Sequence, residues 1–223
     1  MTTISVIIPA RDAAATLAET LGSVSAQSRQ PDEVIVVDDG SQDGTAALAT
    51  AARASVIKQP ARGVAAAMNT GLEAARGDLV AFLDADDLWQ PDCLCEQEQH
   101  LAGRSDLSGS VARFSEFCCP TLVADVAARF VPRVNEPAWL AGGMLLRRQA
   151  FDRAGRLDES LRVGAWVEWV DRARHAGCLF DAIDRIVLRR RLRPGTLSQS
   201  VARNADLLAV ARAALARRRS TPS

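Results

Sequence analysis

The chain has 223 residues, 48% of them hydrophobic and 24% charged, and its 27 Lys and Arg residues balance 27 Asp and Glu residues. This size and composition are typical of one soluble globular domain, and the zero net charge gives no support for a nucleic-acid partner. Five cysteines without the spacing of a zinc site indicate reduced thiols in a cytoplasmic protein, and no segment is long and apolar enough to span a membrane.

Short apolar strands alternate with helices over the first ninety residues. We predict strands at residues 4–8, 33–37, 55–58 and 79–83, and helices at 13–26, 44–54 and 63–75. Continuous Val, Ile and Leu runs are typical of strands that are buried on both faces. Their alternation with helices predicts an α/β fold, with a mainly parallel central sheet flanked by helices as an α/β/α sandwich.

The pattern is weaker after Asp92. We predict helices at 91–101, 148–154 and 167–176, mixed strand and loop at 108–117, a strand with a glycine bend at 139–146, and a strand at 186–191. A basic amphipathic helix at 204–218 has three possible roles: packing on the domain, pairing in a homodimer, or peripheral contact with the inner face of a membrane. No repeat or linker divides the chain, so we expect a single domain over residues 1–223.

Polar clusters follow three of the predicted strands, at residues 9–12 (PARD), 38–41 (DDGS) and 84–87 (DADD). Ligands of parallel sheets bind beyond the carboxyl ends of the strands, so we expect the three clusters to share one rim. The crowded carboxylates of Asp84 and Asp86 repel each other, and a divalent cation, Mg²⁺ or Mn²⁺, would offset that repulsion. We expect Asp87 to cap the next helix or to be solvated, and Trp89 to pack beneath the cluster.

Four segments carry a resemblance to a known family. They are SVIIPARDAAATLAETLGSVSAQS, DEVIVVDDGSQDGT, GVAAAMNTGLEAARGDLVAFLDADD and GGMLLRRQAFDRAGRLDES. Together, and in this order, they resemble the family 2 glycosyltransferases, from about Ile4 to beyond Ala176. The resemblance implies a GT-A fold, a nucleotide-sugar donor, a divalent metal, and transfer of the sugar with inversion at its anomeric carbon.

The resemblance also implies roles for individual positions in the donor half, residues 1 to about 92. The main chain at Pro9, Ala10 and Arg11 would border the nucleotide base. Asp38 would accept a hydrogen bond from that base, commonly uracil, and Asp39 would lie near the ribose. 

Asp84-Ala85-Asp86 matches the D-x-D motif of the family, which binds the donor diphosphate through the metal. Asp86 is the better candidate for direct contact with the metal. Residues from about 93 to 223 would form the acceptor half and the terminal helix. The acceptor itself, whether a glycan, a lipid-linked sugar or a small molecule, is left open.

The chain departs from the family pattern where a catalytic base is expected. The family usually has a Glu-Asp pair whose Asp takes the proton from the acceptor hydroxyl, and Ala165 and Trp166 occupy those positions here. Glu168 and Asp171 lie three residues apart on the predicted helix, hence on one face, and either could act as the base. We prefer Glu168 because it lies nearer the missing carboxylate.

Two other departures affect positive charge. Met68 stands where the family commonly has Arg, and Arg193 stands at the His position of a segment that often lies near the diphosphate in the family. Arg193 could therefore bind phosphate. The other interpretation is a solvated or sheet-edge run, formed by Arg189, Arg190, Arg191 and Arg193.

Two other functions remain open. The protein could be a degenerate module that binds a nucleotide-sugar without transferring it, because the expected base is absent. It could also be a phosphatase with Asp84 as nucleophile, which is less well supported because such enzymes need a later Lys and none follows Lys58. Trp166 and Trp169 favour core packing over stacking on a sugar.

Overall fold

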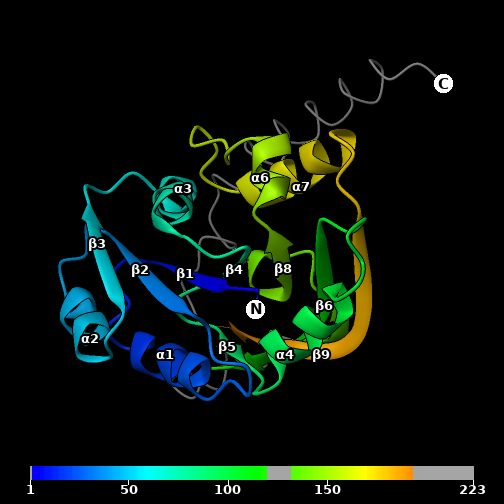
Figure 1. The fold of residues 1–223 in the computed structure, drawn as a ribbon. Coiled ribbons are helices and arrows are strands. Elements are labelled where there is room, and N and C mark those ends of the chain that lie inside the picture. The colour runs from blue at the N-terminus through cyan, green and yellow to red at the C-terminus, as the bar shows by residue number, and fades with distance from the viewer. Residues whose placement is uncertain (1, 120–131, 193–223) are drawn as a thin grey trace.

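A nine-stranded sheet runs through the centre of the molecule, in the order β3-β2-β1-β4-β8-β6-β9-β5, with β7 paired to β6 (Figure 1). The structure is a computed structural model that describes residues 2–119 and 132–192. Helices cover both faces of the sheet, which confirms the predicted α/β sandwich. Arg193 and the predicted helix at 204–218 lie outside the described residues.

The first four strands are parallel, as predicted from their continuous apolar runs. Strand β1 lies between β2 and β4, and Val6 is in register with Val34 on one side and Ala81 on the other. The strands are β1 (Ile4–Ala10), β2 (Glu33–Asp39), β3 (Ser55–Gln59) and β4 (Leu79–Phe82). The helices that connect them are α1 (Leu17–Ser25), α2 (Thr45–Ala51) and α3 (Val64–Ala74).

The second half of the sheet is mixed. Strand β8 is antiparallel to both β4 and β6, β9 is parallel to β6, and β5 is antiparallel to β9. These strands are β5 (Leu88–Trp89), β6 (Gly109–Cys118), β7 (Val134–Pro137), β8 (Met144–Arg147) and β9 (Phe180–Leu192). The helices are α4 (Cys93–Leu101), the 3₁₀ helix η1 (Ala141–Gly143), α6 (Gln149–Ala154) and α7 (Ala165–His175).

Two hydrophobic clusters lie on opposite faces of this sheet. Helices α1, α2 and α4 cover one face, and α3, α6 and α7 cover the other (Figure 1). Close packing requires a glycine on α3, because a Cβ atom at Gly71 would lie 2.3 Å from the Cγ2 atom of Ile7 on β1. Because helices pack closely on both faces of the sheet, the carboxyl ends of the parallel strands are held in fixed relative positions.

Some predictions for the second half were wrong in detail. The predicted strand at 139–146 is a strand only from Met144, because η1 occupies the three preceding residues. Strand β9 is longer than predicted and curves, so that its end pairs with β5, which follows the loop after β4 (Figure 1). None of the described helices has the length and apolar character needed to cross a membrane.

Candidate active site

The loops that follow β1 and β2 are fastened to each other by hydrogen bonds. The main-chain N–H groups of Asp12 and Ala13 donate to the hydroxyl groups of Ser41 (3.0 Å) and Thr45 (2.8 Å). In return, the carboxylate of Asp12 accepts a bond of 2.7 Å from the main chain of Gln42. The loops therefore form one rigid part of the rim.

The predicted nucleotide-contact residues lie at this part of the rim. Pro9 and Ala10, at the end of β1, are buried, whereas Arg11 is exposed. Asp38 is 5% exposed, and its Oδ1 atom accepts a hydrogen bond of 2.9 Å from the main chain of Ser41. The side chain of Asp38 thus stabilises the turn that follows β2.

Asp39 fastens the start of α3 to the end of β2. Its carboxylate accepts hydrogen bonds from the side chain of Gln59 (2.7 Å) and from the main-chain N–H groups of Arg62 and Gly63 (2.8 Å each). With 4% of its surface exposed, Asp39 is part of the framework of the rim. Its predicted position beside a ribose stays a prediction.

A group of three carboxylates follows β4. Asp84, Asp86 and Asp87 each offer an oxygen atom, and these oxygens all lie within 4.8 Å of one another. The loop is tightly turned, since the main-chain N–H of Asp87 donates to the carbonyl oxygen of Asp84 at 3.1 Å. Three oxygen donors at this spacing suit a hard divalent cation such as Mg²⁺ or Mn²⁺.

The electrostatics of the three carboxylates support this interpretation. Asp84 is open to solvent, but surrounding protein limits its hydration, and this effect together with the charge of Asp86 raises its pKa to about 6. Burial, followed by the charges of Asp84 and Asp86, also raises the pKa of Asp87. A bound cation would favour the ionised carboxylates and relieve their repulsion, so the residues present fit the metal that the resemblance implies.

The prediction that Asp87 is a helix cap or a solvated side chain was wrong. Asp87 is 4% exposed, and its Oδ1 atom accepts a hydrogen bond of 2.8 Å from the main-chain N–H of Arg191. The pairing of β5 with β9 brings this distant N–H over the loop. Trp89 is buried, and its indole N–H donates to the carbonyl oxygen of Gly142 at 2.7 Å. Its predicted position beneath the carboxylates stays a prediction.

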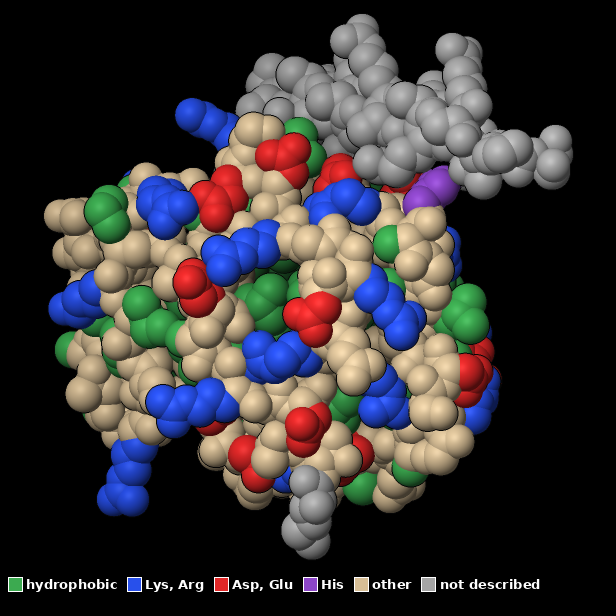
Figure 2. All heavy atoms as spheres, turned by 45° about the horizontal axis from the view of Figure 1, so that its top comes forward, with side chains coloured by type: hydrophobic (Ala, Val, Ile, Leu, Met, Phe, Trp, Pro, Cys, Tyr) green, Lys and Arg blue, Asp and Glu red, His purple; other side chains and the backbone are tan. Residues whose placement is uncertain are grey.

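The arginines of β9 lie in a strand of the sheet and differ in their environments, so the solvated alternative does not hold for all of them. Arg189 is exposed, and Arg191 is 6% exposed. Arg190 forms an ion pair of 3.2 Å with Glu116, and its charge opposes the rise of the pKa values of Asp84 and Asp87. Basic and acidic side chains are also interspersed over the molecular face shown in Figure 2, around a hollow with hydrophobic side chains at its base.

Trp166, at the position expected for the base, lies against the end of β4. Its ring centroid is 5.5 Å from that of Phe82, the last residue of β4, and 5.2 Å from that of Trp169. The indole nitrogen of Trp166 is buried without a hydrogen-bond partner among the described residues. Trp169 is fully buried, as predicted for a core residue.

The two candidate bases lie further along α7. Glu168 is 6% exposed and forms an ion pair of 3.0 Å with Arg172, which also donates to the carbonyl oxygen of Arg156 at 2.7 Å. Asp171 has a side chain that is 25% exposed and lies 3.7 Å from the ring of His175. Glu168 therefore contributes to the packing of α7, whereas Asp171 is the more accessible carboxylate.

Sequence reasoning missed two threonines that bind the acidic loop, Thr16 directly before α1 and Thr20 within it. The hydroxyl groups of Thr16 and Thr20 both donate to the carbonyl oxygen of Ala85, at 2.9 and 3.0 Å. Their spacing of four residues places them on one face of α1, but that spacing does not say which loop they meet. Ala85 thus contributes to the site through its main chain.

Comparison with known proteins decides the family. The family model described as Glycosyl transferase family 2 matches residues 5–116, half of the chain and all of the donor motifs up to Asp87. The chain belongs to glycosyltransferase family 2. The GT-A fold implied by the resemblance is confirmed by a solved structure of TarS residues 1–349 from S. aureus in complex with UDP-GlcNAc, with a TM-score of 0.80 and 19% identity over 99% of this chain and 68% of that one.

Curated relatives of this family 2 chain include named glycosyltransferases. An uncharacterized glycosyltransferase of Nostoc sp. is 29% identical over 79% of this chain and 58% of its own length. The UDP-Glc:α-D-GlcNAc-diphosphoundecaprenol β-1,3-glucosyltransferase of Escherichia coli is 38% identical over 39% of this chain and 36% of its own length. The chain thus spans little more than half of the first relative and about a third of the second.

Proposed function

We propose that this family 2 chain binds a nucleoside-diphosphate sugar at the rim and transfers the sugar to an acceptor hydroxyl with inversion at the anomeric carbon. The observation that carries the proposal is the convergence of Asp84, Asp86 and Asp87 at the end of β4. The E. coli relative is named for a UDP-glucose donor, and TarS was solved with UDP-GlcNAc, so a UDP-sugar is the first donor to test.

Asp84 and Asp86 are the residues that would hold Mg²⁺ or Mn²⁺. The cation, when bound, supplies positive charge that stabilises the diphosphate leaving group without a proton donor. The main chain of residues 9–11 and the side chain of Asp38 would border the base, with Asp39 near the ribose. A lipid-linked sugar is the first acceptor to test, because the name of the E. coli relative contains one.

The proton of the acceptor hydroxyl needs a base, for which we propose Glu168, with Asp171 as the second candidate. The ion pair of 3.0 Å with Arg172 orients Glu168, whose exposure is only 6%. The variant Glu168→Gln keeps the shape of the side chain and removes its basicity. If Glu168 is the base, turnover falls by about 10²- to 10⁴-fold while donor affinity is retained.

Asp171→Asn is the matched variant for this experiment. Loss of turnover in Asp171→Asn, with normal turnover in Glu168→Gln, would assign the base to Asp171 instead. Normal turnover in both variants would remove both from the mechanism. Circular dichroism and thermal unfolding of each variant separate a loss of basicity from a loss of the Glu168–Arg172 ion pair.

A binding module without transferase activity is the second candidate function, and the indole of Trp166 in place of the expected carboxylate favours it. The two functions differ in the fate of a bound donor. A transferase slowly hydrolyses the nucleotide-sugar in the presence of Mn²⁺ or transfers the sugar to an acceptor. A module binds it with the same dependence on Mn²⁺ and returns it unchanged. Membership of family 2 leaves the phosphatase alternative without support.

A thermal-shift screen tests the donor site directly. Nucleoside diphosphates and their sugars are added with and without Mn²⁺, and ligand binding raises the melting temperature because only the folded state binds. We expect a UDP-sugar to raise the melting temperature in the presence of Mn²⁺ and to have a smaller effect in EDTA. The absence of any metal-dependent shift across the panel would contradict the proposed function.

A further inference from the structure

The main chain of the acidic loop is held at two consecutive carbonyl groups. Thr16, directly before α1, and Thr20 of α1 donate their hydroxyl protons to the carbonyl oxygen of Ala85. The Nε–H of Arg191, at the end of β9, donates to the carbonyl oxygen of Asp86 at 2.8 Å. Helix α1 and strand β9 therefore hold the loop on which the proposed metal ligands stand.

Arg191 is itself fixed from several sides. Its Nη2 group forms an ion pair of 2.5 Å with Glu19 of α1, and its guanidinium carbon lies 4.7 Å from the centroid of the Phe117 ring. Its main-chain N–H binds the carboxylate of Asp87 at 2.8 Å. Only 6% of the residue is exposed, so a buried guanidinium group joins α1, β6, β9 and the acidic loop.

We propose that Arg191 is a positioning residue for the metal-binding loop, an inference that rests on the proposed function. By binding the carbonyl oxygen of Asp86 and the carboxylate of Glu19 through two separate nitrogens, the planar guanidinium group fixes the loop between β4 and β5. The side chains of Asp84 and Asp86 then converge before a cation binds, so cation binding does not have to order the loop. Groups that orient metal ligands in this way typically change metal affinity by about 10- to 100-fold when removed.

A purely electrostatic effect of Arg191 has the opposite sign, which makes the proposal testable. A positive charge beside a cation site repels the cation, so its removal strengthens cation binding if position is unimportant. If Arg191 acts by holding the loop, its removal weakens cation binding despite the loss of that repulsion. The direction of the change in Mn²⁺ affinity therefore decides between the two effects.

The experiment compares the Mn²⁺ affinity of the full chain with that of two variants, by isothermal titration calorimetry without nucleotide. Arg191→Met removes the guanidinium group and keeps much of the side-chain length, and Arg191→Lys keeps the charge but replaces two separated donor groups with one. We expect both variants to bind Mn²⁺ at least about tenfold more weakly than the wild type. Equal or tighter binding in Arg191→Met would overturn the proposal, as would wild-type affinity in Arg191→Lys.

Arg189→Met is the matched control. Arg189 lies on the same strand, is exposed, and its guanidinium carbon is also 4.7 Å from the centroid of the Phe117 ring, but no hydrogen bond from its side chain to the acidic loop is found among the described residues. We expect its Mn²⁺ affinity to stay within about twofold of the wild type. A loss equal to that of Arg191→Met would mean that the variants act through the Phe117 contact, which would overturn the role of the carbonyl contact.

A neutral variant covers the case in which Arg191→Met does not fold. Thr20→Val removes one of the two bonds to the carbonyl oxygen of Ala85 without any change in charge. Positioning of the loop predicts a Mn²⁺ affinity lowered by about threefold to tenfold, and unchanged affinity would overturn the proposal. If the wild-type chain binds no Mn²⁺ at all, the metal-assisted function itself is contradicted. This result differs from a weaker or an unchanged Mn²⁺ affinity in the variants.

Discussion

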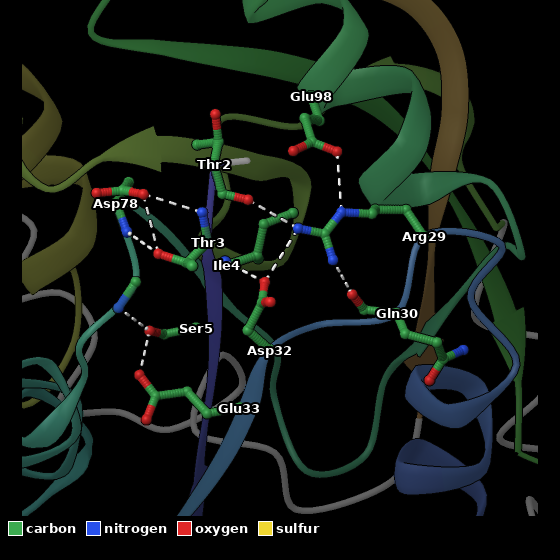
Figure 3. Close-up of polar contacts among 11 residues, drawn as sticks. Thr2, Thr3, Ile4, Ser5, Arg29, Gln30, Asp32, Glu33, Asp78 and Glu98 are labelled. Carbon is green, nitrogen blue, oxygen red and sulfur yellow. Dashed lines mark hydrogen bonds and ion pairs between the residues drawn. The ribbon is translucent and has the colours of Figure 1, made fainter.

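Acidic residues at the amino ends of the parallel strands and those in the loop after β4 have opposite environments. At the amino ends, Asp32, Glu33 and Asp78 are tied into the chain by hydrogen bonds (Figure 3). Asp78 accepts two bonds of 2.9 Å from Thr3, and Asp32 accepts one of 2.8 Å from the main chain of Ile4. The pKa values of all three carboxyl groups are lowered, with hydrogen bonds among the causes in each case.

At the carboxyl end of β4 the acidic residues face one another instead. Crowding and limited hydration raise the pKa values of Asp84 and Asp87. The amino end thus uses carboxylates to stabilise the chain, whereas the loop after β4 keeps them at a cost in stability that the proposed cation would offset. This difference distinguishes the proposed functional end of the sheet from the amino end, and variants at the two ends should have opposite effects.

The largest effect is expected from Asp84→Asn. Loss of a metal-binding carboxylate should lower metal-dependent turnover by a factor on the order of 10² or more, because the charge of the leaving diphosphate is no longer balanced. The metal-free protein should be as stable as the wild type or more so, because a like charge has been removed from the cluster. Activity assays and urea unfolding in EDTA measure the two quantities.

Asp92→Asn is the control for that variant. Asp92 lies in the same segment but is exposed, and it accepts a hydrogen bond of 2.9 Å from Ser28 outside the acidic loop. It should leave turnover unchanged. Marked destabilisation of Asp84→Asn in EDTA would contradict the view that this carboxylate is kept for its ligand.

The converse effect is expected from Ser5→Ala at the amino end. The buried hydroxyl of Ser5 donates to Glu33 and accepts the main-chain N–H of Gly77 at 2.7 Å. Its removal leaves a buried N–H without a partner and should lower the free energy of unfolding by about 1–3 kcal/mol. Urea unfolding gives this value. Nucleotide affinity should not change, and a weaker donor site in Ser5→Ala would mean that the two ends are coupled.

The pH dependence of stability should also separate the two ends. A carboxyl group with a raised pKa binds its proton more tightly in the folded state, so Asp84 makes the metal-free protein less stable as pH rises from about 4 to 6. The raised pKa of Asp87 acts in the same direction. Groups with lowered pKa values, such as Asp32 and Asp78, contribute stability above about pH 4 that is lost in more acidic solution.

Thermal unfolding in EDTA across this range measures the balance, and we expect maximum stability near pH 4–5. Because a cation competes with protons for the carboxylates, added Mn²⁺ should stabilise the protein more at pH 7 than at pH 5. In Asp84→Asn the fall in stability between pH 4 and 6 should be smaller than in the wild type. An equal fall would place the responsible groups elsewhere in the chain.

The sequence predicted those parts of the molecule in which local pattern and three-dimensional position agree. Apolar runs such as residues 33–37 can only be buried strands, and polar residues directly after them must lie at the rim. The rim and its D-x-D carboxylates were therefore accessible to sequence reasoning, while the binding roles of Asp38 and Asp39 stay predictions.

Contacts between distant segments could not be predicted in the same way. Strand β5 has two residues and pairs with residues about a hundred positions later, so no local pattern indicates it. That pairing buries Asp87 against the main chain of Arg191, which reverses the expectation from its polar side chain. The hydrogen bonds from Thr16 and Thr20 to the carbonyl oxygen of Ala85 also depend on how α1 packs against the loop.

The smallest effect is expected at Trp166 of α7, and it tests whether the carboxyl end also leaves an uncharged group unpaired. Trp166→Phe removes an indole N–H that is buried without a partner among the described residues. Removing this unpaired group offsets the loss of apolar contact, so the free energy of unfolding should fall by less than about 1 kcal/mol.

Trp169→Phe is the matched control, because the indole N–H of Trp169 donates to the carbonyl oxygen of Gly155 at 2.8 Å in the core. It should cost about 2–4 kcal/mol through the lost bond and the cavity. Urea unfolding of both variants measures the difference. A larger loss of stability in Trp166→Phe than in Trp169→Phe would mean that the indole N–H of Trp166 has a hydrogen-bond partner in solution. Apart from the acidic loop, the carboxyl end of the sheet would then be as fully hydrogen-bonded as the amino end.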